Sequence, residues 1–213
     1  MKAKSRREFI ESCKVIALGG LASPLLLSLT GCDHDTSAEA KTADIPPAQI
    51  DPKFEPAYLK LHRTGDLKKR GEALWQIMEN CMLCPRECGI NRLEGKTGIC
   101  RASSRLDISS YHAHFGEEQP LVGRRGSGTI FFTHCGLRCV FCINWEINHD
   151  GRGSPRRIEE LADMMLRLQE QGCGNINVVT PTHYSPHILL ALDIAAGMGL
   201  RLPVVYNSSG WER

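Results

Sequence analysis

The sequence has little net charge and no long unbroken apolar run, and each absence argues against a class of protein. Its 26 Lys and Arg nearly balance 24 Asp and Glu, and the first 32 positions hold five of the basic residues and two of the acidic ones. Positions 33–213 therefore carry 21 basic and 22 acidic residues, so no nucleic-acid-binding surface is expected. The most apolar stretch, Val15–Leu29, is interrupted by Gly19, Gly20 and Pro24. It falls short of the ~20 apolar residues that a membrane-spanning helix needs.

The first 56 positions have the pattern of an export signal followed by a tether. Ser5-Arg6-Arg7-Glu8-Phe9-Ile10 has the twin-arginine form and precedes the apolar stretch. Leu29-Thr30-Gly31-Cys32 resembles a bacterial lipobox, which implies that Cys32 is acylated and begins the mature protein. A buried N-terminal helix is the alternative for 1–32. Residues 33–56 lack an apolar period and are interpreted as a flexible tether. We therefore expect an exported lipoprotein attached to the membrane, periplasmic or on an outer face, and a cytoplasmic protein if the signal is not used.

Cysteine is abundant, with ten in 213 residues. Besides Cys13 and Cys32, seven of the remaining eight form two tight groups with spacings typical of metal ligands. These spacings favour metal sites over a disulfide framework, which stays open as an alternative. The eighth, Cys173, has no cysteine near it in the sequence and is expected to be a small buried thiol.

The first group is Cys81-x2-Cys84-x3-Cys88-x11-Cys100. Four thiols at such spacings can close around Zn²⁺ or hold an auxiliary iron–sulfur cluster, and an all-thiolate site suits both. Two disulfides or unliganded thiols are the alternatives. We predict that 57–122 form a small Cys-rich metal-binding module.

The second group is Cys135, Cys139 and Cys142, directly after the apolar run 129–133. Three thiolates can hold three irons of a [4Fe–4S] cluster, which leaves the fourth iron open for another ligand. An open coordination position is what distinguishes a catalytic metal site from a closed structural one.

Strands and helices alternate from position 123 onward. The expected elements are a strand at 129–133, a helix with Ser154 as N-cap and Pro155 as first residue that ends at Gln171, a strand at 175–180, a helix at 186–198 and a strand at 203–206. This order predicts an α/β fold with about three parallel strands joined by right-handed crossovers. Ligands of such folds bind at the carboxyl ends of the strands.

The motif Cys-x3-Cys-x-aromatic-Cys, with Phe141 at the aromatic position, resembles the cluster motif of radical S-adenosylmethionine (SAM) enzymes. Segments 126–132, 144–147, 175–184 and 204–210 extend the similarity, which covers roughly 73–213, to the pyruvate-formate-lyase-activating-enzyme-like subgroup. The resemblance implies that 123–213 are the N-terminal half of a (βα) radical SAM barrel. Since a whole barrel has about six strands, a C-terminally truncated chain is expected.

The same resemblance implies the function. SAM would bind the open iron, and an electron from a flavodoxin- or ferredoxin-type donor would cleave it to a 5′-deoxyadenosyl radical that abstracts hydrogen from a substrate, with a partner protein as one candidate. The residues carried over to the SAM pocket are Phe141, Thr180, Thr182 and Asn207. The last three could instead be turn or capping residues, and His183 is expected at the pocket rim. The alternative function is a catalytically inactive, truncated iron–sulfur or metal-binding lipoprotein.

Overall fold

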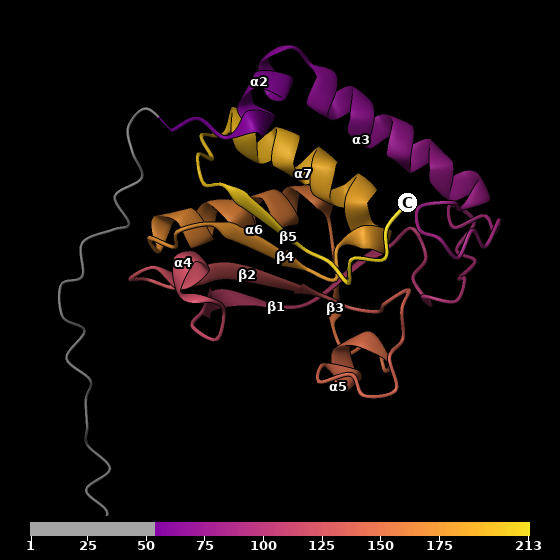
Figure 1. Ribbon diagram of the computed structural model, residues 1–213. Coiled ribbons are helices and arrows are strands. Elements are labelled where there is room, and N and C mark those ends of the chain that lie inside the picture. Colours follow the sequence, from indigo (N-terminus) through magenta and orange to yellow (C-terminus); the bar gives the residue numbers. More distant parts are fainter. Residues whose placement is uncertain (1–53) are drawn as a thin grey trace, which may run out of the picture. The chain divides into compact units, whose positions relative to one another are not determined.

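The computed structural model describes residues 54–213 (Figure 1). The predicted export signal, the lipidation site at Cys32 and nearly all of the predicted tether lie outside the described residues. Within 54–213 the helices are α2 (Ala57–Arg63), α3 (Asp66–Ile77), α4 (Gln119–Val122), α5 (Trp145–Asn148), α6 (Ile158–Glu170) and α7 (Ser185–Gly197), with 3₁₀ turns η1 (Met78–Asn80) and η2 (Thr182–Tyr184). The strands are β1 (Leu106–His114), β2 (Ser127–Phe132), β3 (Ser154–Arg156), β4 (Ile176–Val179) and β5 (Val204–Asn207).

The five strands form one mixed sheet in the order β3-β1-β2-β4-β5. β2, β4 and β5 are parallel, with Ile130 opposite Val178 and Val178 opposite Tyr206. The predicted α/β class with three parallel strands is thus confirmed for the described residues. All three parallel strands end at the same edge of the sheet, which brings the segments that follow them together.

The antiparallel half of the sheet is formed by β1 and its two neighbours. β1 pairs with β2 and also with β3, although β1 falls inside the predicted Cys-rich module and β2 outside it. The sheet therefore runs continuously across the boundary expected between 122 and 123, and no separation of the fold occurs there.

The predicted start of the helix after the second cysteine group is wrong. Ser154 and Pro155 belong to β3, where Ser154 pairs with Ile108 of β1. The helix α6 begins at Ile158 instead, behind a capping box in which the Glu160 carboxylate accepts a hydrogen bond from the Arg157 backbone N–H at 2.9 Å. Its predicted end is confirmed, since Gly172 follows the C-cap with a left-handed φ of 84°.

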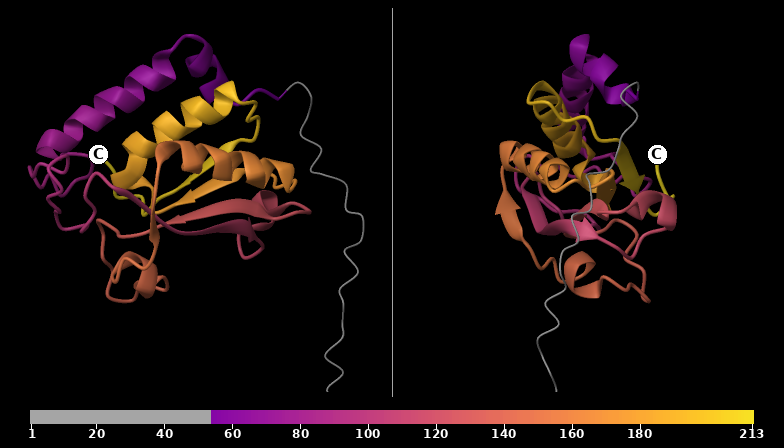
Figure 2. Two further views of the ribbon diagram at one scale, coloured as in Figure 1. Left: turned by 180° about the vertical axis from the view of Figure 1, so that it is seen from behind. Right: turned by 90° about the vertical axis from the view of Figure 1, so that its left-hand side faces the viewer.

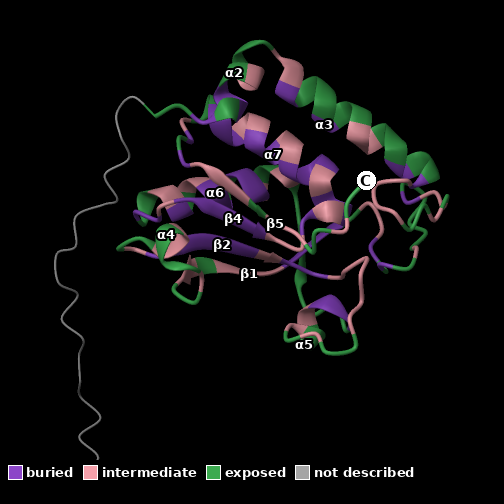
Figure 3. Ribbon diagram, viewed as in Figure 1, coloured by how far each residue is buried: buried purple, intermediate pink, exposed green. Residues whose placement is uncertain are grey.

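Helices α6 and α7 cover one face of the sheet, and α3 packs against α7 on the side away from α6 (Figures 1 and 2). The core forms between this helix layer and the sheet, where Leu161, Met165 and Leu168 of α6 repeat at helical spacing and are fully buried. The buried residues follow β2, β4 and the inner sides of α6 and α7, while the outer side of α3 is exposed (Figure 3). No helix within residues 54–213 is long and apolar enough to cross a membrane.

Candidate functional site

A cavity of about 190 Å³ lies where the segments after β2, β4 and β5 meet. The segment after β2 contributes Cys135, Cys139 and Cys142, all three cysteines of the second group. Thr180 follows β4, and Asn207 is the last residue of β5. Because the carboxyl ends of parallel strands meet at one edge of the sheet, residues more than 70 positions apart in the chain lie together here.

The segment with the second cysteine group is tightly curled and held by side chains of its own. His134 and Arg138 take left-handed φ values of 67° and 54°. The His149 ring stacks on Trp145 at 3.7 Å and donates through Nε2 to the Cys139 carbonyl at 3.1 Å. Because Nε2 then carries the proton, Nδ1 accepts from the Arg138 guanidinium at 3.2 Å. These contacts fix the backbone on which the three thiols are mounted.

Two N–H groups face sulfur atoms of this group. The Leu137 backbone N–H lies 3.4 Å from Cys135 Sγ, and the Asn148 side-chain amide lies 3.3 Å from Cys142 Sγ. Asn148 is buried at the end of α5. N–H donors directed at cysteine sulfur are a recurrent feature around iron–sulfur clusters, since they stabilise the negative charge of the thiolate.

Thr180 has a strained backbone at the cavity wall. Its φ is 59°, in the left-handed region that β-branched residues rarely enter. The conformation lets the Thr180 N–H donate to the Asn207 carbonyl at 3.1 Å, which ties the segments after β4 and β5 together. Strain of this kind costs about 1–3 kcal/mol and is concentrated at binding sites.

The structure brings three of the four predicted pocket residues to the cavity. Thr180, Thr182 and Asn207 line it, and the Thr182 hydroxyl also donates to Glu212 at 2.7 Å. Phe141 does not line it, since its side chain is 82% exposed. His183 also lines the cavity, but from a buried position, since it is 2% exposed and its Nε2 donates to the Thr133 carbonyl at 2.8 Å. Burial lowers the pKa of His183 to about 3, so the ring is neutral.

The first cysteine group lines a separate, much smaller cavity. Cys81, Cys84, Cys88 and Cys100 all border this space of about 10 Å³, roughly the room of one water molecule. Desolvation by burial raises the pKa of Cys84 and of Cys100, which favours their neutral thiol form in the protein without metal.

The two cavities share a wall. Cys84 and His183 line both of them. Arg86 bridges the two groups from outside: its Nε donates to the Gly136 carbonyl at 3.1 Å, and its guanidinium lies 4.9 Å from the centre of the Trp211 ring. The two cysteine groups, which are separate in the sequence, are therefore neighbours in space.

The cysteines of the described residues do not form a preformed site for a single metal ion. All eight cysteines of residues 54–213 are free thiols. Within the same residues no three His, Cys, Asp or Glu side chains gather closely enough to hold one metal ion. Thiolates of a [4Fe–4S] cluster bind different irons at different corners and do not converge on one point. Cys135, Cys139 and Cys142 meet that looser requirement by lining one cavity, with N–H donors already placed at two of the sulfurs.

Several cavity residues were not predicted as site residues. They are Gly136, Leu137, Arg138, Asn148, Val179, Ser208, Ser209 and Trp211. Leu137 and Arg138 could have been found from their positions between the cysteines, and the two serines because they follow a predicted parallel strand. The sequence carries no signal that would place the Asn148 amide at the Cys142 sulfur, because this depends on how α5 folds back.

Comparison with known proteins leaves the family of the chain open. No protein-family model matches the chain, and no solved structure matches it. Over 142 residues it is 34% identical to an uncharacterized protein of the archaeon Methanocaldococcus jannaschii. The match covers 62% of this chain but 39% of that protein, so the chain corresponds to well under half of its relative.

Proposed function

We propose that this protein is a radical SAM iron–sulfur protein of the activating-enzyme-like kind. Cys135, Cys139 and Cys142 would hold three irons of a [4Fe–4S] cluster and leave the fourth for the amino and carboxylate groups of SAM. The observation that carries the proposal is the cavity that these three cysteines share with Thr180 and Asn207 at the ends of three parallel strands. A closed structural metal site would not need such an opening beside it.

The chain's own residues would hold and orient the ligands. The Leu137 and Asn148 N–H groups would stabilise the thiolates, and the strained Thr180 would present its side chain and backbone to the amino-acid end of SAM. Thr182 and Asn207 border the remaining space. When bound, the cluster supplies one electron, received from a flavodoxin- or ferredoxin-type donor, for reductive cleavage of SAM to methionine and a 5′-deoxyadenosyl radical.

We also propose that the sheet is part of a (βα) radical SAM barrel. The parallel arrangement of β2, β4 and β5, with α6 and α7 on one face, supports this. The signal-like pattern of residues 1–32 supports a further proposal, that the protein is exported and lipidated at Cys32.

The test is SAM cleavage by the anaerobically reconstituted full chain. With dithionite as the electron source, we expect 5′-deoxyadenosine in the wild type and in Cys173→Ala, whose buried thiol borders neither cysteine cavity. A triple substitution of Cys135, Cys139 and Cys142 by Ala should abolish the product and remove the absorption of the cluster that these three cysteines hold. Wild-type protein with a full cluster but no 5′-deoxyadenosine would refute the enzyme and favour the inactive metal-binding lipoprotein.

A further inference from the structure

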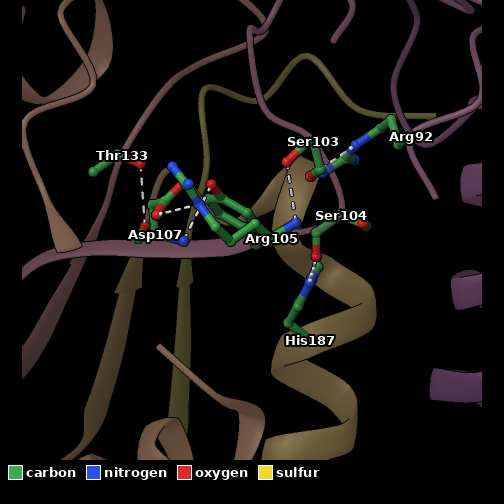
Figure 4. A network of polar contacts seen from close by, with 8 residues as sticks. Arg92, Ser103, Ser104, Arg105, Asp107, Thr133 and His187 are labelled. Carbon is green, nitrogen blue, oxygen red and sulfur yellow. Dashed lines mark hydrogen bonds and ion pairs between the residues drawn. The ribbon is translucent and has the colours of Figure 1, made fainter. Parts of the chain in front are cut away.

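Arg92 is a fully buried guanidinium whose hydrogen bonds all go to neutral groups. It is 1% exposed. Its Nη1 donates to the His183 carbonyl at 2.8 Å. Its Nε and Nη2 donate to the Ser103 carbonyl at 3.2 and 2.6 Å (Figure 4). These bonds satisfy N–H groups but bring no negative charge.

No carboxylate within residues 54–213 forms an ion pair with Arg92. The buried Asp107 in the same network is paired with Arg105, 3.0 Å from Asp107 Oδ1 to Arg105 Nε (Figure 4). A guanidinium stays protonated in proteins, and a buried charge without a counter-charge is strongly unfavourable. The buried charge of Arg92 therefore requires a nearby anion, and no carboxylate of residues 54–213 supplies one.

The groups that can become anionic beside Arg92 are the thiols of the first cysteine group. Arg92 borders the cavity that Cys81, Cys84, Cys88 and Cys100 line, and its Nη1 lies 4.0 Å from Cys81 Sγ. We propose that these four cysteines bind a second, thiolate-ligated metal centre and that Arg92 is the positioning residue that compensates its charge. The centre is either one Zn²⁺ or an iron–sulfur cluster.

The net charge of the metal centre is negative for both kinds of centre. On binding, the four thiols lose their protons to solvent, and four thiolates around a divalent ion or a doubly positive cluster core leave two net negative charges. Arg92 offsets one of them. The sulfurs must also move, since they do not converge on one point. This is feasible because the segment between Cys81 and Arg92 has no helix or strand and is held by a few backbone hydrogen bonds, such as Gly89 N–H to Cys81 O at 3.0 Å.

The test isolates this centre from the proposed catalytic cluster. In the full chain with Cys135, Cys139 and Cys142 replaced by Ala, we expect one centre to remain after loading with Zn²⁺ or with Fe²⁺ and sulfide. Metal analysis and visible absorption distinguish the two kinds. Loss of the centre on further substitution of Cys81 and Cys84 by Ala is expected. Failure of the triple variant to bind either metal would overturn the inference and leave the proposed function untouched.

Arg92 is tested in the same background by chelator competition. We expect Arg92→Met to raise the dissociation constant of the bound metal at least tenfold and Arg92→Lys to raise it less, because Lys keeps the charge. Arg70→Met, which removes an exposed charge on α3, should leave it unchanged. The denaturant midpoint of the metal-free Arg92→Met protein is measured beside it, because the Ser103 and His183 carbonyls lose their donor in this variant. Unchanged metal affinity with a destabilised metal-free protein would show that Arg92 is only structural.

Discussion

The hydrogen bond from Asn148 to Cys142 makes a quantitative prediction about the proposed cluster. The amide nitrogen lies 3.3 Å from the sulfur, and Asn148 is buried, so water cannot readily replace the donor. An N–H group stabilises the more negative, reduced form of the cluster more than the oxidised form. The substitution Asn148→Ala should therefore lower the reduction potential.

The size of the shift follows from the strength of such bonds. Hydrogen bonds to charged groups contribute about 1.5–3 kcal/mol. If this hydrogen bond is about 1 kcal/mol stronger in the reduced cluster than in the oxidised one, its loss lowers the potential by about 40 mV. The conversion holds because 59 mV and about 1.4 kcal/mol both correspond to a tenfold change in an equilibrium constant for one electron.

The assay is a redox titration followed by electron paramagnetic resonance, on wild type, Asn148→Ala and Asn144→Ala. Asn144 belongs to the same segment, and its side chain makes no hydrogen bond within residues 54–213, so its variant should keep the wild-type potential. A potential that is unchanged or raised in Asn148→Ala would refute the reasoning. An equal drop in both variants would show that the segment as a whole, and not this bond, sets the potential.

Three further predictions concern stability and processing. Gly128→Ala should destabilise the protein by about 1–3 kcal/mol in urea unfolding, because a Cβ there would lie 2.6 Å from the Asn175 carbonyl oxygen. Gly174→Ala is the control. Its Cβ would lie 3.9 Å from the nearest atom, so the free energy of unfolding should change by less than about 0.5 kcal/mol. Burial lowers the pKa of His187 to about 4. Below pH 6.5 the unfolded state therefore binds a proton that the folded state does not. This difference should lower the free energy of unfolding by about 2 kcal/mol from pH 7 to pH 4.5. His187→Gln should remove that part of the loss, and an unchanged pH dependence would contradict the assignment. Cells fed a labelled fatty acid should label the wild type but not Cys32→Ala, and label retained in the variant would rule out Cys32 as the acylated residue.

The parallel half of the fold was predictable because its signals are local. Apolar spacing in α6 and glycines such as Gly172 and Gly199 mark where helices lie and end, and short β-branched runs mark the strands. The carboxyl-end rule then placed Thr180 and Asn207 beside the cysteines without any knowledge of tertiary contacts.

The features that were missed depend on contacts between distant segments. Ser154 is a reasonable N-cap by itself, and only the pairing with Ile108 on β1 makes it a strand residue. His183 lines the cavity as expected, but only the hydrogen bond from its ring to the Thr133 carbonyl shows that the side chain is buried there. Phe141 matches the motif, yet the curl of the segment directs its side chain to solvent.

The most direct test of the central claim is the electron paramagnetic resonance spectrum of the reduced, anaerobically reconstituted chain, recorded with and without SAM. The account predicts a [4Fe–4S] signal from a cluster held by Cys135, Cys139 and Cys142 that changes when SAM binds the open iron. Substituting these three cysteines by Ala should remove that signal. A spectrum that SAM does not alter, or a SAM-dependent change that survives the triple substitution, would contradict the account.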